Sequence, residues 1–528
     1  MTLPDPGLRP ASGGVDTPEW VRDAIFYQIF PDRFARSERV PKPGPLEPWS
    51  DPPTSHGFKG GDLLGVVEHL DHLTDLGVSA IYFNPIFQSA SNHRYHTYDY
   101  LAVDPLLGGD GAFRELLDAC HERGIRVVID GVFNHASRGF WPFNHVLETG
   151  RASPYRDWFF FHQEDLEAGR PIRAYPLDAI RVNAATFLDD GGLGTRSLGT
   201  LGYQAWWDLP ALPKLNTDNP HVEAYLLDVA EHWTRFGIDG WRLDVAEEVP
   251  DRFWRTFRER VKGVNPEAYI VAEIWHERPD AVRGDMFDAL MNYPLGLAIA
   301  SFAGAGRLDQ RVIGQHGILA RSVRDDDGRA FLERVTRVLS IYDRAVTEVQ
   351  MNLLDSHDTP RFLSMVSGDS TSLRLGLLAL LTLPGAPTIY YGDEIGMQGE
   401  FDPLSRGAFP WDEPATWDRG LLAFVRRTIA ARHQQRVLRR GDFRGLGAGD
   451  RAAAYLRLAT DGAAIVALNA GDEPVRLQVD APELAGRALA AAVTTSDGPG
   501  GLAGAAVGAD GGLELALPAR FGALFVAG

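Results

Sequence analysis

The chain has 528 residues, of which 45% are hydrophobic and 23% are charged, a composition typical of a globular protein. Its 71 acidic residues exceed its 52 basic residues, so the formal net charge is −19. A surface of that charge repels phosphate groups, and we therefore expect no nucleic-acid partner. Cys120 is the only cysteine, which excludes an internal disulfide.

The sequence also indicates no association with a membrane. No apolar run approaches the ~18 residues that a membrane-spanning helix needs. The N-terminus has no basic segment followed by an apolar one, so it does not resemble a signal peptide. From these features and the single cysteine, we expect a cytoplasmic protein.

The predicted elements follow a regular order along the chain. Residues 1–19 are rich in proline and glycine and predict a flexible lead-in. After them, apolar runs typical of buried strands alternate with helix-like segments, several of which end at a glycine. The runs read AIFYQIF, SAIYFNPIF, RVVIDGVF, IDGWRLD, YIVAEIW, DALMNY, VQMNLLD and PTIYYGDE. Eight strands alternating with helices predict an α/β protein with a closed parallel (β/α)8 TIM barrel, spanning residues 20–135 and 216–438.

Two parts of the chain depart from that alternation. An aromatic, irregular segment separates the third and fourth strands and is far longer than one helix requires. We interpret residues 136–215 as an insertion domain over the mouth of the barrel. Beyond about residue 440, glycine, alanine and valine dominate, period-two stretches appear, and Asp461-Gly462 fits a hairpin turn. Residues 439–528 therefore predict a C-terminal all-β sandwich domain.

Polar residues gather at the ends of the predicted strands, where barrel enzymes keep their catalytic groups. Any one of them has an ordinary interpretation as a strand cap or a buried ion pair. Together, carboxylates, an arginine and histidines on neighbouring strand ends indicate a catalytic pocket. The residues are Asp130, Asn134 and His135 on the third strand, Arg242 and Asp244 on the fourth, Glu273 on the fifth, and His357 and Asp358 on the seventh.

Glycoside hydrolysis is the chemistry that best fits several carboxylates in one pocket without a cysteine or a phosphate-binding loop. It needs one carboxylate as nucleophile or base, and one carboxylic acid that protonates the leaving oxygen. Arg242 beside Asp244 would keep that aspartate ionised, because a neighbouring cation favours the charged form. Glu273 is followed by Ile274 and Trp275, and this apolar setting would favour a protonated acid.

Four sequence blocks resemble the four blocks of the α-amylase family, glycoside hydrolase family 13. The blocks are IDGVFNH, GWRLDVAEE, AEIW and LLDSHD. They occur in the family's order and on the expected strands, and the resemblance runs from about Asp23 to the C-terminus. Four further stretches are similar to sequences of the group of cyclomaltodextrinases, neopullulanases and maltogenic amylases. They are FYQIFPDRFA, GGDLLGVVEHLDHL, PIFQSASNHRYHTYDY and LPKLN.

The resemblance implies a role for each candidate residue. Asp244 would be the nucleophile that forms a covalent intermediate, Glu273 the general acid and then the base, and Asp358 would hold sugar hydroxyls near the transition state. The implied substrate-binding residues are Tyr95, Asp130, His135, Arg242 and His357 around the reacting glucose, and Glu248, Trp275, Trp206 and Trp207 toward the acceptor side. For the tryptophans, a place in the hydrophobic core is the ordinary alternative.

The implied activity is retaining hydrolysis of α-1,4-glucosidic bonds in maltooligosaccharides, cyclodextrins or pullulan, with transglycosylation as a side reaction. An exo-acting α-glucosidase with the same catalytic residues is the close alternative, because the four blocks do not determine the shape of the pocket. The retaining mechanism predicts that the carboxyl groups of Asp244 and Glu273 lie ~5–5.5 Å apart.

Two further classes stay open from the residues alone. A metal-dependent barrel hydrolase would use the histidines of HRYH, His93 and His96, together with His135 and the pair His357 and Asp358. A catalytically silent barrel is the other alternative, and the presence of all three carboxylates argues against it.

The sequence departs from the resembled group in several places. Members often carry an extra N-terminal β-domain that supports dimerisation, which we do not find here, so the choice between a monomer and a homo-oligomer stays open. The loop after the first strand often binds calcium, but ARSERVPKPG has Glu38 as its only acid, and hard cations need several oxygen ligands. We expect no cofactor for the chemistry and no calcium at that loop, and Asn134 stays a candidate metal ligand. Glu247 stands where the group often has asparagine.

Overall fold

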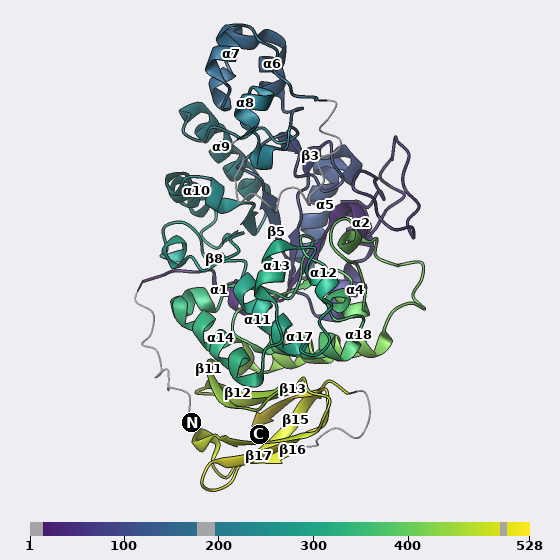
Figure 1. Ribbon diagram of the computed structural model, residues 1–528, viewed down its shortest axis with the longest axis vertical. Helices are drawn as coiled ribbons and strands as arrows, with labels where there is room; N and C mark the ends of the chain where they lie inside the picture. Colours follow the sequence, from purple (N-terminus) through teal and green to yellow (C-terminus); the bar gives the residue numbers. More distant parts are fainter. Residues whose placement is uncertain (1–13, 177–195, 497–503, 528) are drawn as a thin grey trace.

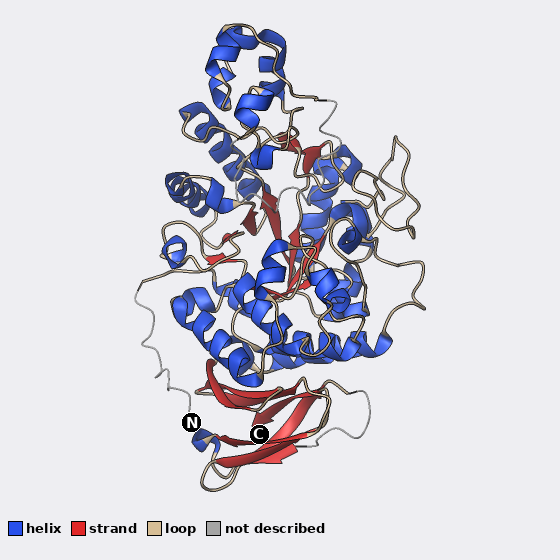
Figure 2. Ribbon diagram, viewed as in Figure 1, coloured by secondary structure: helices blue, strands red, loops and turns tan. Residues whose placement is uncertain are grey.

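The computed structural model describes residues 14–176, 196–496 and 504–527. A barrel of strands lies in the middle of the molecule and is surrounded by helices, as Figures 1 and 2 show. Helices α6, α7 and α8 lie at one end of the molecule, and a set of β-sheets lies at the opposite end, against helices α14, α17 and α18. The first helix is α1 (Glu19–Asp23). The predicted lead-in before residue 14 lies outside the described residues.

Eight parallel strands form the barrel, in the order β8-β7-β6-β5-β2-β1-β10-β9. A parallel bridge between Met291 and Met351 joins the two ends of this row and closes it. Each predicted apolar run overlaps one strand, so the predicted barrel is confirmed. The strands are β1 (Phe26–Ile29), β2 (Ala80–Phe83), β5 (Arg126–Gly131), β6 (Gly240–Leu243), β7 (Tyr269–Ala272), β8 (Ala289–Leu290), β9 (Met351–Leu353) and β10 (Ala386–Tyr390).

Helices cover the outer face of the barrel, which explains why the strands read as continuous apolar runs. Helix α9 shows how the sequence sets their bounds: the Asn219 side chain accepts from the His221 amide at its start, and Gly237 ends it with φ 114°. The main covering helices are α3 (Leu63–Glu68), α4 (Leu70–Leu76), α5 (Gly109–Glu122), α9 (Pro220–Phe236), α10 (Asp251–Val264), α11 (Tyr293–Ala303), α14 (Gly328–Ile341), α17 (Ser370–Thr382) and α18 (Arg419–Gln434).

Short helices occupy several connections between these elements. They are α2 (Pro31–Phe34), α12 (Gln310–Ile313), α13 (Gly317–Ser322), α15 (Arg344–Thr347), α16 (Phe362–Met365) and α19 (Arg436–Arg440). A hairpin that the sequence analysis did not predict, β3 (Phe87–Ser89) with β4 (Thr97–Val103), follows β2.

The predicted insertion lies between β5 and β6. Its described part contains α6 (Trp141–Thr149), α7 (Gln163–Glu167) and α8 (Ser197–Leu201), and residues 177–195 lie outside the described residues. An antiparallel bridge between His135 and Lys214 joins the far end of the insertion to the loop that follows β5. The insertion is thereby attached at the carboxyl end of the barrel strands.

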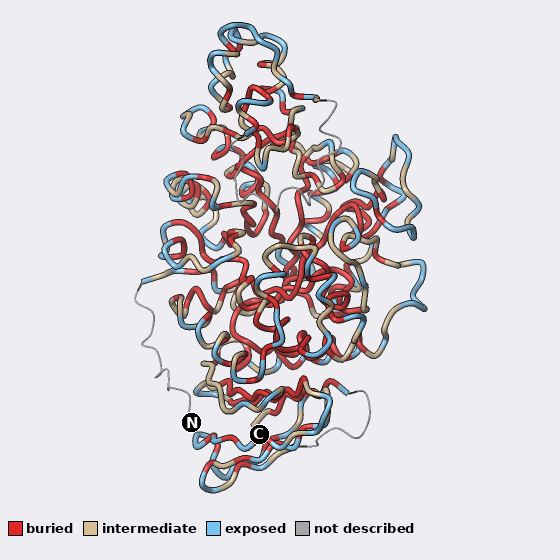
Figure 3. Tube along the Cα trace, in the orientation of Figure 1, coloured by how far each residue is buried: buried red, intermediate tan, exposed pale blue. Residues whose placement is uncertain are grey.

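The C-terminal part is all-β, as predicted. A six-stranded sheet has the order β11-β12-β13-β18-β15-β16, and a smaller sheet pairs β14 with β17. The hairpin between β12 and β13 pairs Ala459 with Gly462, so its turn is Thr460–Asp461, one residue earlier than predicted. Figure 3 shows the buried residues along the barrel and along the sheet beside it. The strands are β11 (Asp442–Ala448), β12 (Ala452–Ala459), β13 (Gly462–Asn469), β14 (Val475–Asp480), β15 (Ala488–Thr494), β16 (Gly504–Ala506), β17 (Gly512–Leu517) and β18 (Phe521–Ala527).

Candidate active site

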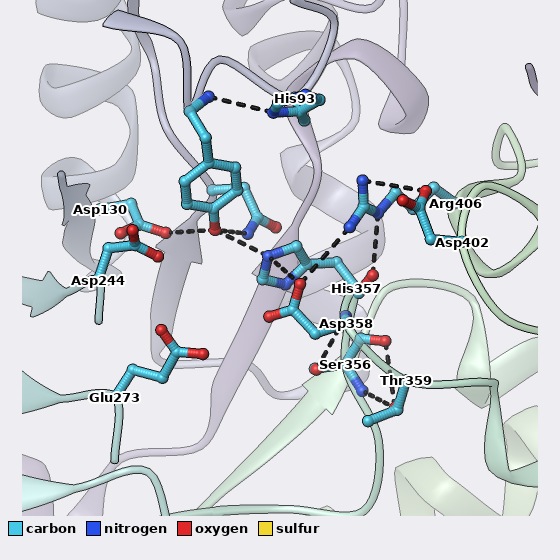
Figure 4. A network of polar contacts seen from close by, with 12 residues as sticks. His93, Asp130, Asp244, Glu273, Ser356, His357, Asp358, Thr359, Asp402 and Arg406 are labelled. Carbon is cyan, nitrogen blue, oxygen red and sulfur yellow. Dashed lines mark hydrogen bonds and ion pairs between the residues drawn. The ribbon is translucent and has the colours of Figure 1, made fainter. Parts of the chain in front are cut away.

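Four predicted carboxylates and a histidine converge at the carboxyl ends of the barrel strands. Asp130 lies near the end of β5, Asp244 directly after β6, and Glu273 directly after β7. His357 and Asp358 lie in the loop that follows β9. Figure 4 shows these five side chains around one space. Parallel strands present their carboxyl ends at the same rim of a barrel, so the spacing along the chain becomes a cluster in space.

Arg242 joins three of these carboxylates. Its Nη1 lies 2.9 and 3.0 Å from the two oxygens of Asp130 and 2.8 Å from Asp244 Oδ1. Its Nη2 lies 3.0 Å from Glu273 Oε2. Arg242 is fully buried, and its Nε is 3.4 Å from Met291 Sδ. One guanidinium therefore holds Asp244 and Glu273 on its two terminal nitrogens, which brings the two carboxyl groups close together.

The electrostatic setting of Asp244 differs from the one predicted. Burial raises the pKa of Asp244 well above its usual range, against the opposing charge of Arg242, and the charges of Glu273, Asp130 and Asp358 add to the rise. Arg242 favours the ionised form of Asp244, as predicted, but burial and the other carboxylates have the larger effect on the pKa. The prediction considered the pair alone, whereas in the structure one cation contacts three carboxylates.

The surroundings of Glu273 are also more polar than predicted. Its Oε2 accepts from the Val245 amide at 3.0 Å and lies 3.0 Å from Arg242 Nη2, and its Oε1 accepts from Trp275 Nε1 at 3.1 Å. Val245 has φ 45° and ψ 44°, a left-handed conformation that is strained for a β-branched residue. That conformation turns the Val245 amide toward Glu273. The apolar setting predicted for Glu273 is therefore wrong, because donors from β6, its loop and Trp275 surround the carboxylate.

Asp358 is held by groups on both of its sides. Its Oδ1 is 3.2 Å from His357 Nε2 and 3.5 Å from Arg406 Nη2. Burial raises the pKa of Asp358 to about 7; the charge of Glu273 adds to the rise, and Arg406 and Arg242 oppose it. Arg406 also donates to the His357 carbonyl at 2.9 Å and pairs with Asp402 at 3.1 Å (Figure 4). No sequence pattern predicts Arg406, which ends a three-residue 3-10 helix (Leu404–Arg406) after β10.

The raised pKa of Asp358 predicts that the carboxylate destabilises the fold at neutral and alkaline pH. A pKa of about 7 in the folded state, above the ordinary 3.8, makes a stabilising contribution that is complete below about pH 4 and is lost as the pH rises through 7. An asparagine at position 358 has no carboxyl group to ionise, so the variant does not lose stability in this way as the pH rises. We expect the variant to be more stable than the wild type at about pH 8, by up to ~4 kcal/mol, and equally stable near pH 4. Denaturant unfolding across this pH range measures the difference.

Asp239→Asn is the matched control for that measurement. Burial raises the pKa of Asp239, but hydrogen bonds from His121, the Val127 amide and Arg126 outweigh it, and the net direction is downward. Such a group stabilises the fold above its ordinary pKa, so Asp239→Asn is expected to lose stability at about pH 8. If both variants lost stability at that pH, the assignment of a raised pKa to Asp358 would be wrong.

Tyr95 and His357 form one wall of the same site. Their rings stack with centroids 5.6 Å apart and an interplanar angle of 5°. The Tyr95 hydroxyl donates to Asp130 Oδ2 at 2.8 Å and lies 2.7 Å from His357 Nε2. Tyr82, which the sequence analysis did not single out, donates to the same Asp130 oxygen at 2.9 Å. Asp130 thus orients Arg242, Tyr82 and Tyr95 from the floor of the site.

His135, Trp206 and Trp207 form a stack of three rings. The rings of His135 and Trp206 are 4.9 Å apart, and those of Trp206 and Trp207 are 4.8 Å apart. Burial lowers the pKa of His135 to about 3, and His96 and Lys214 add to the fall. Trp207 is 43% exposed, with φ 51°. The stack therefore runs from the buried site to the surface, and an interpretation of Trp207 as a core residue does not fit its exposure.

Trp275 extends the site in another direction. Its ring stacks on Tyr293 at 3.6 Å and on His316 at 5.1 Å, while its indole nitrogen donates to Glu273. Glu247, which follows β6, lies 3.6 Å from the imidazole of His276. The hydrogen bond to Glu273 places the indole ring of Trp275 next to the proposed acid.

The candidate metal ligand Asn134 contacts an ammonium group. Lys214 Nζ donates to Asn134 Oδ1 at 2.8 Å, to the Glu248 carbonyl at 3.1 Å and to Glu248 Oε2 at 3.0 Å. The residues at Asn134 therefore do not fit a calcium ion, because a lysine cation already occupies its amide oxygen. Lys214 lies in LPKLN, and this stretch was noted only for its similarity to relatives.

The histidines of HRYH do not form a metal site in the described part of the chain. The rings of His93 and His96 are 4.9 Å apart, and burial lowers the pKa of both, that of His96 to about 4. Across residues 14–176, 196–496 and 504–527, no group of three or more histidine, cysteine or acidic side chains has an arrangement that holds a metal ion. Nor does any helix within these ranges have the length and apolarity to cross a membrane.

Comparison with known proteins gives the family. Residues 28–413 match the family model described as "Alpha amylase, catalytic domain". The chain is 43% identical to a cyclomaltodextrinase of Geobacillus thermopakistaniensis over 448 residues, which cover 84% of this chain and 68% of the relative. It is 40% identical to neopullulanase 2 of Thermoactinomyces vulgaris over 476 residues, 89% of this chain and 73% of the relative.

A solved structure covers nearly the whole length of both chains. The debranching enzyme of Nostoc punctiforme superposes with a TM-score of 0.81 and 40% identity, over 97% of this chain and 100% of that one. The family match spans all four carboxylates of the site and Arg242. The chain belongs to the α-amylase family of glycoside hydrolases.

Proposed function

We propose that the protein is a retaining glycoside hydrolase that cleaves α-1,4-glucosidic bonds in maltooligosaccharides, cyclodextrins and pullulan. The observation that carries the proposal is the guanidinium of Arg242, which holds Asp244 and Glu273 side by side. Retaining enzymes need two carboxyl groups ~5–5.5 Å apart, one as nucleophile and one as acid. The relatives named cyclomaltodextrinase and neopullulanase 2 support the substrate class.

In the first proposed step, the carboxylate of Asp244 attacks the anomeric carbon and forms a glycosyl ester. Arg242 holds Oδ1, which leaves Oδ2 as the attacking atom. Glu273 gives its proton to the glycosidic oxygen as the bond to the leaving sugar breaks. The charges of Glu273, Asp130 and Asp358 disfavour an ionised Asp244, so a proton on Glu273 lowers the repulsion that the nucleophile experiences.

In the second step, Glu273 takes a proton from a water molecule, and the water oxygen bonds to the anomeric carbon and displaces the carboxylate of Asp244. The product keeps the α-configuration because two displacements occur at the same carbon. A sugar hydroxyl that takes the place of water gives transglycosylation. The open end of the His135–Trp206–Trp207 stack and the Trp275 ring provide the aromatic faces on which we place acceptor sugars, with Tyr95 stacking on the reacting glucose.

The proposed chemistry uses no cofactor. The calcium position at Asn134 is taken by Lys214 in our proposal, which gives the lysine a structural role between the loop after β5 and Glu248. We also propose a cytoplasmic location, supported by the single cysteine.

Product analysis tests the proposal. Purified protein is given γ-cyclodextrin, pullulan and maltotriose, and the anomeric configuration of the first products is followed by NMR. We expect α-products from all three substrates, because the mechanism retains configuration. Pullulan is expected to yield panose, which requires cleavage of its α-1,4 bonds, whereas maltotriose would indicate cleavage of the α-1,6 bonds.

Other outcomes contradict parts of the proposal. Release of glucose from maltotriose, while pullulan and γ-cyclodextrin stay intact, would identify the exo-acting α-glucosidase instead. Initial β-products would overturn the retaining mechanism and the role of Asp244 as nucleophile.

A further inference from the structure

Four side chains behind the carboxylates, three of them buried, form a closed ring of hydrogen bonds. Gln28 in β1 lies 3.1 Å from Asn84 Oδ1 and 2.9 Å from His357 Nδ1, both measured from its Nε2. Asn84 Nδ2 lies 3.1 Å from the Tyr95 hydroxyl, which is 2.7 Å from His357 Nε2. Gln28, Asn84 and His357 are at most 1% exposed. Gln28 and Asn84 appear in none of the roles assigned so far.

The direction of every bond in this ring follows from Asp130. Its Oδ2 accepts from Arg242, from Tyr82 and from Tyr95. The only proton of the Tyr95 hydroxyl is therefore donated to Asp130. The Tyr95 oxygen is then an acceptor for Asn84 Nδ2 and for a proton on His357 Nε2. These assignments leave Asn84 Oδ1 as an acceptor.

The remaining two bonds close the ring. A neutral imidazole with its proton on Nε2 has a bare Nδ1, which can only accept. The Gln28 amide has two protons, and its Nε2 faces both acceptors, Asn84 Oδ1 and His357 Nδ1. The opposite orientation of Gln28 would place its carbonyl oxygen against two acceptors. The ring is therefore satisfied in one arrangement.

We propose that Gln28 is a positioning residue that sets the tautomer of His357, so that His357 presents an Nε2 proton to Tyr95 and Asp358. This inference deepens the proposed function and rests on it for its catalytic consequence. His357 Nε2 lies 2.7 Å from the Tyr95 oxygen and 3.2 Å from Asp358 Oδ1, so a proton on it hydrogen-bonds to Tyr95 and lies beside the Asp358 carboxylate. With the proton on Nδ1 instead, His357 would place a lone pair against Tyr95 and against Asp358.

The charges around His357 keep the ring neutral, which the arrangement requires. Burial lowers the pKa of His357 well below its usual range, and the cations Arg406 and Arg242 and the imidazole of His93 lower it further. Asp358 faces the ring from the loop after β9, with its Oδ1 3.2 Å from His357 Nε2. Figure 4 shows Arg406 on one side of His357 and Asp130 on the other.

The first test observes the tautomer directly. Long-range proton–nitrogen NMR of 15N-histidine-labelled protein distinguishes Nδ1–H from Nε2–H, and a His357→Gln sample identifies the signal among the 15 histidines. We expect a neutral ring with the proton on Nε2 between about pH 6 and pH 8. A proton on Nδ1 in the wild type would overturn the proposal, whatever the variants do.

The second test reverses the donor. Gln28→Glu keeps the shape of the side chain but replaces the amide donor by an acceptor, so we expect a proton on His357 Nδ1. We expect kcat/KM on maltotriose to fall roughly 10–100-fold, as for other partners that orient a functional histidine. We also expect a changed pH profile, because the ring then titrates beside a carboxylate. Gln28→Met removes the donor without adding an acceptor and serves if the glutamate variant does not fold.

Gln350→Glu is the matched control. Gln350 is also a buried glutamine beside a barrel strand, and its Oε1 accepts from the Leu290 amide at 2.6 Å. The same substitution there is expected to lower stability without moving the His357 signal or the pH profile. A Gln28→Glu protein with an unchanged His357 tautomer would overturn the proposal. If the tautomer moves as expected but no protein hydrolyses an α-glucan, Gln28 keeps its positioning role and the proposed function fails.

Discussion

Asp244→Asn is expected to lower kcat on every α-glucan and every aryl α-glucoside by about 10⁴-fold to 10⁶-fold, the range seen when a catalytic nucleophile is removed. An asparagine at this position keeps an oxygen that accepts the hydrogen bond from Arg242, but it has no carboxylate to attack the anomeric carbon. Steady-state kinetics on maltotriose and on an aryl α-maltoside measure the loss. The loss should be similar on both substrates, because both pass through the same glycosyl ester.

Glu273→Gln is the matched comparison for this prediction. A glutamine cannot protonate the leaving oxygen, so natural glucans are expected to react far more slowly, whereas aryl glucosides with good leaving groups need less protonation and lose less. Equal losses on both substrate types would show that Glu273 is not the acid. An Asp244→Asn protein that kept full activity on the aryl substrate would show that Asp244 is not the nucleophile.

Arg242→Met is expected to lower the free energy of unfolding by about 3–5 kcal/mol near pH 7 and to abolish activity. The substitution removes the one guanidinium that contacts Asp130, Asp244 and Glu273, and breaking a buried ion pair leaves its partner charged and unpaired. At about pH 5 the loss should be smaller, because the three carboxylates accept protons more readily without the cation. Denaturant unfolding at the two pH values measures both effects.

Arg457→Met provides the control for Arg242→Met. Arg457 is equally buried, but it donates to the backbone carbonyls of Thr382, Leu438 and Gly441, which do not titrate. Its loss is expected to destabilise the fold by a similar amount at both pH values. If Arg242→Met were no less destabilised at pH 5 than at pH 7, the carboxylate cluster would not be the cause.

Much of the fold could be predicted because the patterns that indicate its strands and helices lie within short stretches of the sequence. Each barrel strand lies within a short, mainly apolar run of the sequence with helical segments between, and burial on both faces makes such runs nearly continuous. The hairpin β3–β4 escaped prediction because β3 has only three residues, both strands are partly exposed, and the irregular stretch that contains Tyr95 separates them. The turn at Thr460–Asp461 was misplaced by one residue, since Asp461-Gly462 is itself a favoured hairpin sequence.

Within the site, the sequence alone determined which residues lie at the rim of the barrel. Asp130, Asp244, Glu273 and Asp358 each follow an apolar run, and parallel strands bring such positions to one end. The four blocks around them also determined the resemblance, which the family match supports.

Only the tertiary structure decided how these residues interact. Gln28 and His357 are 329 residues apart in the chain, and Lys214 and Asn134 are 80 apart, so no local pattern indicates that they touch. The surroundings predicted for Asp244 and Glu273 were incomplete because each was inferred from its neighbours in sequence, which do not include Asp130, Asp358 or the Val245 amide as contacts. A pKa depends instead on burial and on charges from other strands, and those are set when the barrel closes and one guanidinium is shared among three carboxylates.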